Sequence, residues 1–161
     1  LAVHSKLGQG TTFIIYLPAN PDLSDAAEVP LEAAAYRTSR ILIMDDEAPL
    51  ARAAERILRS KGYHTTTVRD GDECLRAYRR ALLDDDPFDL VMLDLTIPGG
   101  MGGTATLVHL QELDSEVKAI VSSGYSNDPV MSDPTAYGFC AIVPKPYTAS
   151  DLIVTVSRVL A

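Results

Sequence analysis

The sequence predicts an α/β protein in which a five-stranded parallel sheet carries helices on both faces. Beyond residue 40, short apolar runs alternate with amphipathic segments, a pattern typical of repeated strand–helix units. Three of the apolar runs, 41–44, 90–93 and 141–143, are followed closely by acidic or lysine residues. Polar groups gather in this way where parallel strands end at one edge of a sheet.

The five expected strands are short runs rich in aliphatic, β-branched and aromatic residues. They are 41–44, 63–68, 88–94, 117–121 and 139–143. Each is followed by a segment with helical spacing of apolar residues, so the strands should run parallel to one another.

Start and stop signals bound the helices between these strands. Pro49 suits the first turn of the first helix, which should end at Lys61-Gly62. Asp70 begins the second helix, and the run 84–87, three aspartates and a proline, stops it in a solvated loop. The later helices are expected over 104–113, within 127–137, and over 149–160. Two prolines, at 129 and 134, should make the helix within 127–137 short or broken.

The first 39 residues have a different pattern. Residues 1–17 read as two strands joined by a polar, glycine-rich turn, Ser5 to Gly10. Because a lone hairpin is marginal in water, we expect it to belong to a larger sheet. Residues 18–39 are rich in Pro, Ala, Asp and Glu without a period, which indicates a linker. We therefore expect a hairpin (1–17), a linker (18–39) and one domain (40–161).

Composition narrows the function. The net charge of −8 disfavours a binder of nucleic-acid backbones, which needs clustered Lys and Arg. No apolar stretch reaches the roughly 20 residues that a membrane-spanning helix needs. We therefore expect these 161 residues to lie in the cytoplasm. Cys74 and Cys140 are too few and too far apart for a zinc motif, and both are expected in the core. The three histidines lack ligand spacing and should lie at the surface.

The residues at the strand ends point to phosphoryl chemistry. Asp94 is the candidate nucleophile, because a carboxylate can carry a phosphoryl group as an acyl phosphate. Asp45 and Asp46 would add negative charge beside it, which requires a cation, and Mg²⁺ prefers such hard oxygen ligands. Ser123 offers a hydroxyl donor and Lys145 a mobile positive charge, both suited to a developing dianion.

Four motifs make residues 40–161 resemble the receiver domain of two-component response regulators. They are Ile-Leu-Ile-Met-Asp45-Asp46-Glu, Leu-Asp94-Leu-Thr-Ile-Pro-Gly-Gly-Met-Gly, Val-Ser-Ser123-Gly-Tyr and Lys145-Pro146-Tyr. The resemblance implies a flavodoxin-like (CheY-like) fold with strand order 2-1-3-4-5. It also implies that Asp94 accepts phosphate from a phosphohistidine of a histidine kinase or of a histidine phosphotransfer domain, with a change of conformation.

The same resemblance implies roles for the remaining site residues. Mg²⁺, with Mn²⁺ as the alternative, would be held by Asp45, Asp46, Asp94 and the backbone carbonyl of Thr96, while Ser123 and Lys145 contact the phosphoryl group. The Lys145–Pro146 bond is often cis in this family. Thr96 and Tyr125 occupy places that tune phosphate lifetime. Ile142 departs from the pattern, because an aromatic residue that switches rotamer often stands there.

The amino-terminal hairpin resembles the last hairpin of the ATP-binding domain of sensor histidine kinases. The matching residues are Ser5, Gly8, Gly10, Thr11 and Phe13, followed by Leu17-Pro18. With the receiver motifs, this implies the carboxyl-terminal part of a hybrid sensor histidine kinase whose whole chain could be membrane-anchored. Residues 1–161 lack the phosphoaccepting helix, the nucleotide motif and the lid of a histidine kinase. We therefore expect that these 161 residues alone do not bind ATP. An unrelated strand pair is the alternative for the hairpin.

Two other functions are weighed against a phosphoacceptor. One is a phosphatase of the haloacid dehalogenase type, whose Asp-x-Asp motif would need an acid at Thr96. The other is a receiver-shaped module that binds a partner through its fourth helix and fifth strand without being phosphorylated. The sequence keeps the acidic pair Asp45-Asp46, Asp94, Ser123 and Lys145, and this argues against a module that is never phosphorylated.

Overall fold

The computed structural model describes residues 2–6, 8, 10–14, 39–124 and 128–161. The chain divides into two compact units, Leu1–Ala35 and Tyr36–Ala161. Within the described residues, no helix has the length and apolar character needed to span a membrane.

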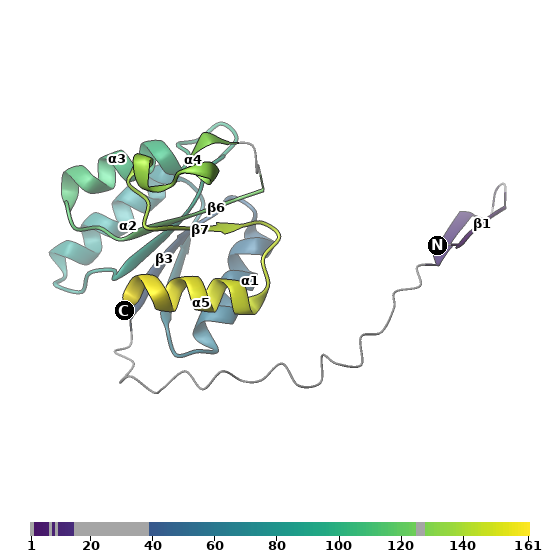
Figure 1. The fold of residues 1–161 in the computed structure, drawn as a ribbon, viewed down its shortest axis with the longest axis horizontal. Helices are drawn as coiled ribbons and strands as arrows, with labels where there is room; N and C mark the ends of the chain where they lie inside the picture. The colour runs from purple at the N-terminus through teal and green to yellow at the C-terminus, as the bar shows by residue number, and fades with distance from the viewer. Residues whose placement is uncertain (1, 7, 9, 15–38, 125–127) are drawn as a thin grey trace. The chain divides into compact units, whose positions relative to one another are not determined.

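The second unit contains a parallel sheet in the order β4-β3-β5-β6-β7 (Figure 1). Its strands are β3 (Arg40–Met44), β4 (His64–Val68), β5 (Leu90–Asp94), β6 (Ala119–Ser123) and β7 (Ala141–Pro144). Counted within this unit, the order is 2-1-3-4-5, and every neighbouring pair is parallel. The predicted α/β fold class and strand order are therefore confirmed.

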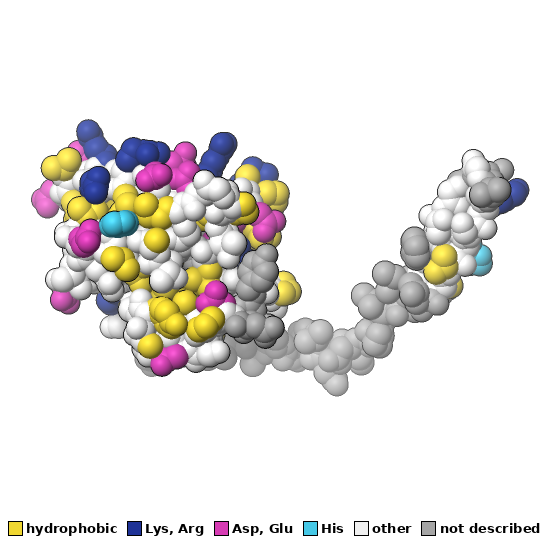
Figure 2. All heavy atoms as spheres, turned by 90° about the horizontal axis from the view of Figure 1, so that it is seen from above, with side chains coloured by type: hydrophobic (Ala, Val, Ile, Leu, Met, Phe, Trp, Pro, Cys, Tyr) yellow, Lys and Arg dark blue, Asp and Glu magenta, His cyan; other side chains and the backbone are white. Residues whose placement is uncertain are grey.

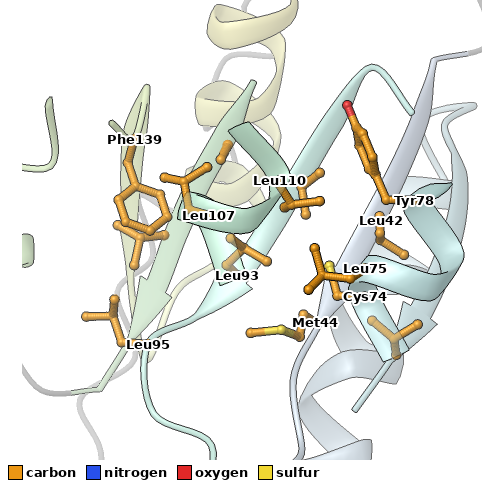
Figure 3. Packing of buried hydrophobic residues seen from close by; sticks show 14 of the residues in the cluster. Leu42, Met44, Cys74, Leu75, Tyr78, Leu93, Leu95, Leu107, Leu110 and Phe139 are labelled. Atoms are coloured by element: carbon orange, nitrogen blue, oxygen red, sulfur yellow. The ribbon is translucent and has the colours of Figure 1, made fainter. Parts of the chain in front are cut away.

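Helices cover both faces of this sheet. They are α1 (Ala48–Arg59), α2 (Gly71–Leu83), α3 (Gly103–Leu113), α4 (Pro129–Ser132) and α5 (Ala149–Leu160). Side chains alternate along each strand, so each face builds its own core. One core joins β3 and β5 to α2 and α3 through residues such as Leu93, Tyr78 and Leu107 (Figure 3). The other joins Ile43 and Met92 to α1 and α5.

Two details of the carboxyl-terminal half bear on the sequence predictions. Helix α4 has only four residues and is followed by a 3-10 helix, η2 (Thr135–Tyr137), as the two prolines predict. Strand β6 was expected over 117–121 but begins at Ala119, because the backbone N–H of Val117 donates to Asp114 in the turn after α3. The shift brings Ser122 and Ser123 into the strand.

The prediction that both cysteines pack in the core is half wrong. Cys74 is buried in α2, but Cys140 is exposed. Phe139 and Ala141 are buried on either side of Cys140, so the alternation of side chains turns Cys140 outward. All three histidines are exposed, as expected. Figure 2 shows one face of the molecule, where charged side chains of both signs lie among hydrophobic ones.

The first unit contains an antiparallel hairpin of β1 (Ala2–Lys6) and β2 (Gly10–Ile14). Its ladder reaches Lys6 opposite Gly10, so the connection is shorter than the expected turn from Ser5. The hydroxyls of Ser5 and Thr11 are hydrogen-bonded across the strands at 2.8 Å. The expected linker lies, except for Ser39, outside the described residues, so the boundaries of the three expected parts stay a prediction.

Candidate functional site

The sheet topology brings the charged strand ends together. Asp45 directly follows β3, Asp94 ends β5, and Lys145 directly follows β7. Parallel strands end at the same edge, so residues separated by 51 and 100 positions meet there. Carboxylate oxygens of Asp45, Asp46 and Asp94 lie within 4.8 Å of one another.

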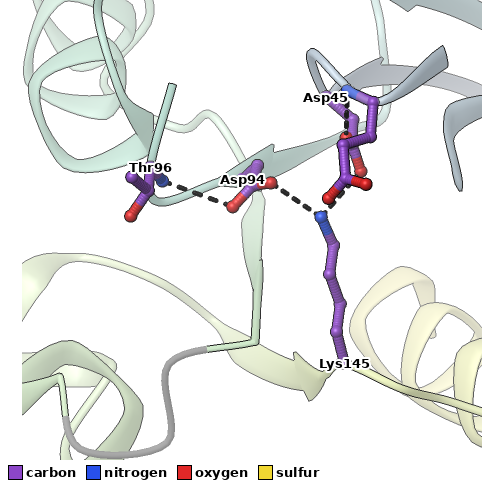
Figure 4. Close-up of polar contacts among 5 residues, drawn as sticks. Asp45, Asp94, Thr96 and Lys145 are labelled. Carbon is purple, nitrogen blue, oxygen red and sulfur yellow. Dashed lines mark hydrogen bonds and ion pairs between the residues drawn. The ribbon is translucent and has the colours of Figure 1, made fainter. Parts of the chain in front are cut away.

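Lys145 bridges two of these carboxylates (Figure 4). Its Nζ donates to Oδ2 of Asp45 at 2.8 Å and to Oδ2 of Asp94 at 2.7 Å. The three side chains are only 11%, 4% and 10% exposed, respectively. Burial by itself lowers the pKa of Lys145, but the hydrogen bonds and charges of Asp45 and Asp94 outweigh it and raise that pKa above its usual value. The lysine therefore stays protonated and positively charged in this site.

Backbone N–H groups hold the other oxygens of the two bridged carboxylates. The N–H of Glu47 donates to Oδ1 of Asp45 at 2.9 Å, and the N–H of Thr96 donates to Oδ1 of Asp94 at 3.3 Å. Both donors lie two residues past their acceptor, in the loops that leave β3 and β5. These contacts orient the carboxylates independently of Lys145.

The loop between β5 and α3 passes close to the site because of two glycines: Gly102, which ends the Asp94 motif quoted from the sequence, and Gly103, which the sequence did not single out. A Cβ at Gly102 would lie 2.2 Å from the carbonyl oxygen of Leu95, and one at Gly103 would lie 2.6 Å from that of Asp94. Both contacts are far below van der Waals separation, so only glycine fits. Two glycines at the start of a helix that follows an acidic strand end are a usable sequence signal.

A cavity of about 640 Å³ opens over the carboxylates. Its lining combines charged groups with an apolar wall, and includes Asp46, Asp94, Lys145, Leu50, Pro98 and Tyr147. Charged side chains at the base of the cavity beside an apolar wall suit a small charged group that is attached to a larger binding partner.

The donor set fits a hard divalent cation. It consists of three carboxylates, of which Asp45 and Asp94 are buried and Asp46 is exposed. Mg²⁺ prefers oxygen ligands and keeps several of its waters, which the exposed side of the site permits. With Lys145 as the cation in contact with them, two of the three negative charges stay uncompensated. An acidic triad of this composition is typical of a Mg²⁺ site.

The other residues expected from sequence have these positions. Ser123 is buried at the end of β6, and Ile142 is partly buried against the core of α2 and α3. The Lys145–Pro146 peptide bond is cis. Tyr125 lies outside the described residues. The structure adds Ser122, which is 1% exposed and pairs with Asp94 in the β5–β6 register.

Comparison with known proteins agrees with this geometry. Residues 41–157 match the family model of the response regulator receiver domain. Sensor kinase CckA of Brucella abortus is 27% identical over 165 residues, covering 97% of this chain and 17% of that kinase. Sensory transduction protein RegX3 of Mycobacterium bovis is 35% identical over 74% of this chain and 50% of its own length. The chain thus spans half or less of these two relatives.

Solved structures show the same fold. The receiver domain of NtrX from Brucella abortus is 30% identical, with a TM-score of 0.66 over 74% of this chain and 97% of that one. A chain of the CheX-CheY-BeF3-Mg+2 complex from Borrelia burgdorferi is 25% identical, with a TM-score of 0.69 over 76% of this chain and 90% of that one. The fold, the acidic strand ends bridged by a lysine and the match over 41–157 lead to one conclusion: the chain belongs to the response regulator receiver domain family.

Proposed function

We propose that this receiver accepts a phosphoryl group on Asp94 from a phosphohistidine and thereby acts in a two-component phosphorelay in the cytoplasm. The observation that carries the proposal is the set of three carboxylates within 4.8 Å of one another, two of them bridged by Lys145. A structural ion pair would need one carboxylate, whereas a phosphoacceptor needs a nucleophile, metal ligands and a mobile cation.

Each site residue has its own role in the proposed phosphoryl transfer. A carboxylate oxygen of Asp94 forms a bond to phosphorus, and the phosphorus–nitrogen bond of the donor breaks with its electron pair left on the imidazole. Lys145 then turns from Asp94 to the phosphoryl oxygens, and the Ser123 hydroxyl donates to another of them. Asp45, Asp46, Asp94 and the carbonyl of Thr96 would hold Mg²⁺, and the bound ion would supply positive charge to offset the charge that develops on the phosphoryl oxygens. Thr96 and Tyr125 would tune the lifetime of the acyl phosphate.

The wider context is also a proposal. We infer that residues 1–17 are the last hairpin of a histidine-kinase ATP-binding domain, 18–39 a linker, and 40–161 the carboxyl-terminal receiver of a hybrid sensor kinase. The similarity to CckA supports this, because it extends over 97% of the chain and so includes the hairpin. The phosphodonor would be a histidine of the cognate kinase or of a histidine phosphotransfer domain. The apolar wall of Leu50, Pro98 and Tyr147 suits such a protein partner.

Labelling with acetyl phosphate tests the acceptor. The wild-type chain should gain one phosphoryl mass in Mg²⁺, lose it in hydroxylamine as an acyl phosphate does, and stay unlabelled in EDTA. Asp94→Asn should not label, whereas Asp72→Asn, an exposed aspartate in the first turn of α2, should label like the wild type. Labelling of Asp94→Asn would refute the assignment. An unlabelled wild type would favour the receiver-shaped module that binds a partner without being phosphorylated. Sustained turnover of acetyl phosphate would favour the phosphatase of the haloacid dehalogenase type.

A further inference from the structure

A second serine lies beside the acceptor, and in the described part of the chain its hydroxyl has no hydrogen-bond partner. Ser122 is 1% exposed, and its Oγ is the one buried side-chain oxygen or nitrogen without a partner among the described residues. A buried hydroxyl that loses its bonds to water destabilises the fold unless something replaces them. Such an atom in a native core therefore requires an explanation.

The register places Ser122 on the site's side of the sheet. It pairs with Asp94 on β5 and with Val143 on β7. Side chains alternate along a strand, and Ile120, Met92 and Val143 all belong to the core of α1 and α5. Ser122, Asp94 and Lys145 each lie two residues beyond one of these, so the three side chains share one face.

In the present form, both oxygens of Asp94 already have donors. Lys145 Nζ occupies Oδ2 and the Thr96 N–H occupies Oδ1. The Ser122 hydroxyl bonds to neither oxygen, although Ser122 lies opposite Asp94 on the neighbouring strand, about 4.8 Å away in such sheets. If Lys145 leaves Asp94, one oxygen loses a charged donor, and rotation of Ser122 about χ1 is the smallest movement that replaces it.

We propose that Ser122 is a positioning residue of the phosphoacceptor, whose hydroxyl donates to Asp94 when Lys145 turns to the phosphoryl group. The inference rests on the proposed function above. In the transfer, one Asp94 oxygen becomes bonded to phosphorus and the other becomes the acyl carbonyl, which accepts the hydrogen bond from Ser122 Oγ. No proton is transferred. The unpaired hydroxyl of the resting form thus has its partner in the phosphorylated form.

Ser122→Ala tests the inference by separating resting stability from binding of a phosphoryl mimic. The variant should unfold at the same or a higher temperature than the wild type in EDTA, because it removes an unpaired hydroxyl. With Mg²⁺ and BeF3⁻, its apparent affinity by calorimetry should fall about 3- to 10-fold, the equivalent of one neutral hydrogen bond. Labelling by acetyl phosphate should slow by a similar factor, and Ser122→Thr, which keeps the hydroxyl, should recover both.

Val121→Ala is the matched control, because it truncates the adjacent residue of β6 on the opposite face. It should lower the unfolding temperature but leave BeF3⁻ affinity near the wild-type value. Unchanged affinity and labelling in Ser122→Ala would overturn the inference, as would equal losses in Val121→Ala. A lower unfolding temperature in Ser122→Ala with unchanged affinity would overturn it too, because the hydroxyl then has a water partner. A wild type that neither labels nor binds BeF3⁻ would overturn the proposed function itself.

Discussion

Replacing Lys145 with methionine should expose the electrostatic strain of the acidic site. Methionine keeps much of the apolar stem but removes the charge that bridges Asp45 and Asp94. The carboxylate oxygens of Asp45 and Asp94 lie within 4.8 Å of each other, so two unit charges there repel by at least about 3 kcal/mol at an effective dielectric constant of about 20, which suits side chains that are 4% and 10% exposed. Lys145 offsets this repulsion in the wild type, and in the variant no side chain does. Removing one partner from a buried pair typically costs about 3–5 kcal/mol, which agrees. We expect a loss of about 3 kcal/mol in EDTA.

Urea denaturation followed by far-ultraviolet circular dichroism measures this loss. With an m-value of about 2 kcal/mol/M, the midpoint should fall by about 1.5 M. Mg²⁺ should restore more stability to Lys145→Met than to the wild type, because the ammonium no longer competes with the metal for the carboxylates. Lys61→Met, at an exposed position after α1, should leave the midpoint unchanged. A Lys145→Met midpoint equal to that of the wild type in EDTA would refute this reasoning.

Two further predictions concern stability away from the carboxylates. Burial and then the charge of Asp70 raise the pKa of Cys74 from 9.0 to about 12. The contribution of this thiol to the free energy of unfolding is therefore complete below pH 9. It is lost as the pH rises from 9 towards 12, by about 1.4 kcal/mol per pH unit. Urea midpoints between pH 8 and 11 should show this fall, and Cys74→Ala should make it shallower; an unchanged slope would contradict it. Gly102→Ala should destabilise the fold by about 1–3 kcal/mol through its contact with the Leu95 carbonyl. Gly124→Ala, where an added Cβ meets no atom of the described residues within 4 Å, should be neutral in the same thermal melt. Equal effects of the two substitutions would show that the close approach at Gly102 is unimportant.

Most of the fold could be predicted because local signals agree with the tertiary structure. The final helix spans Ala149–Leu160, as its helical spacing of apolar residues predicts, and the structure adds a capping box at Thr148. The broken fourth helix follows from its prolines, which remove backbone donors. The start of β6 was missed because the turn after α3, which contains the hydrogen bond from Val117 to Asp114, extends further than expected. The exposure of Cys140 was missed because the phase of a strand is set by its neighbours.

The sequence predicted which residues form the site, but not which atoms of these residues are in contact. Acidic and basic residues after apolar runs indicated which groups would meet, and Asp45, Asp46, Asp94 and Lys145 do meet. Ser122 was not singled out, since a serine within an apolar run carries no sign of its orientation. Its relation to Asp94 appears only in the register of β5 with β6.

The sequence by itself determined the alternation of strands and helices and the kind of chemistry at the strand ends, because periodicity and residue type are local properties. Only the tertiary structure decided that Lys145 bridges two buried carboxylates and that Ser122 shares their face. It also decided that Gly102 and Gly103 permit the loop to pass close to the end of β5. These relations depend on strand order, register and side-chain phase, which arise when segments far apart in the chain pack into one sheet.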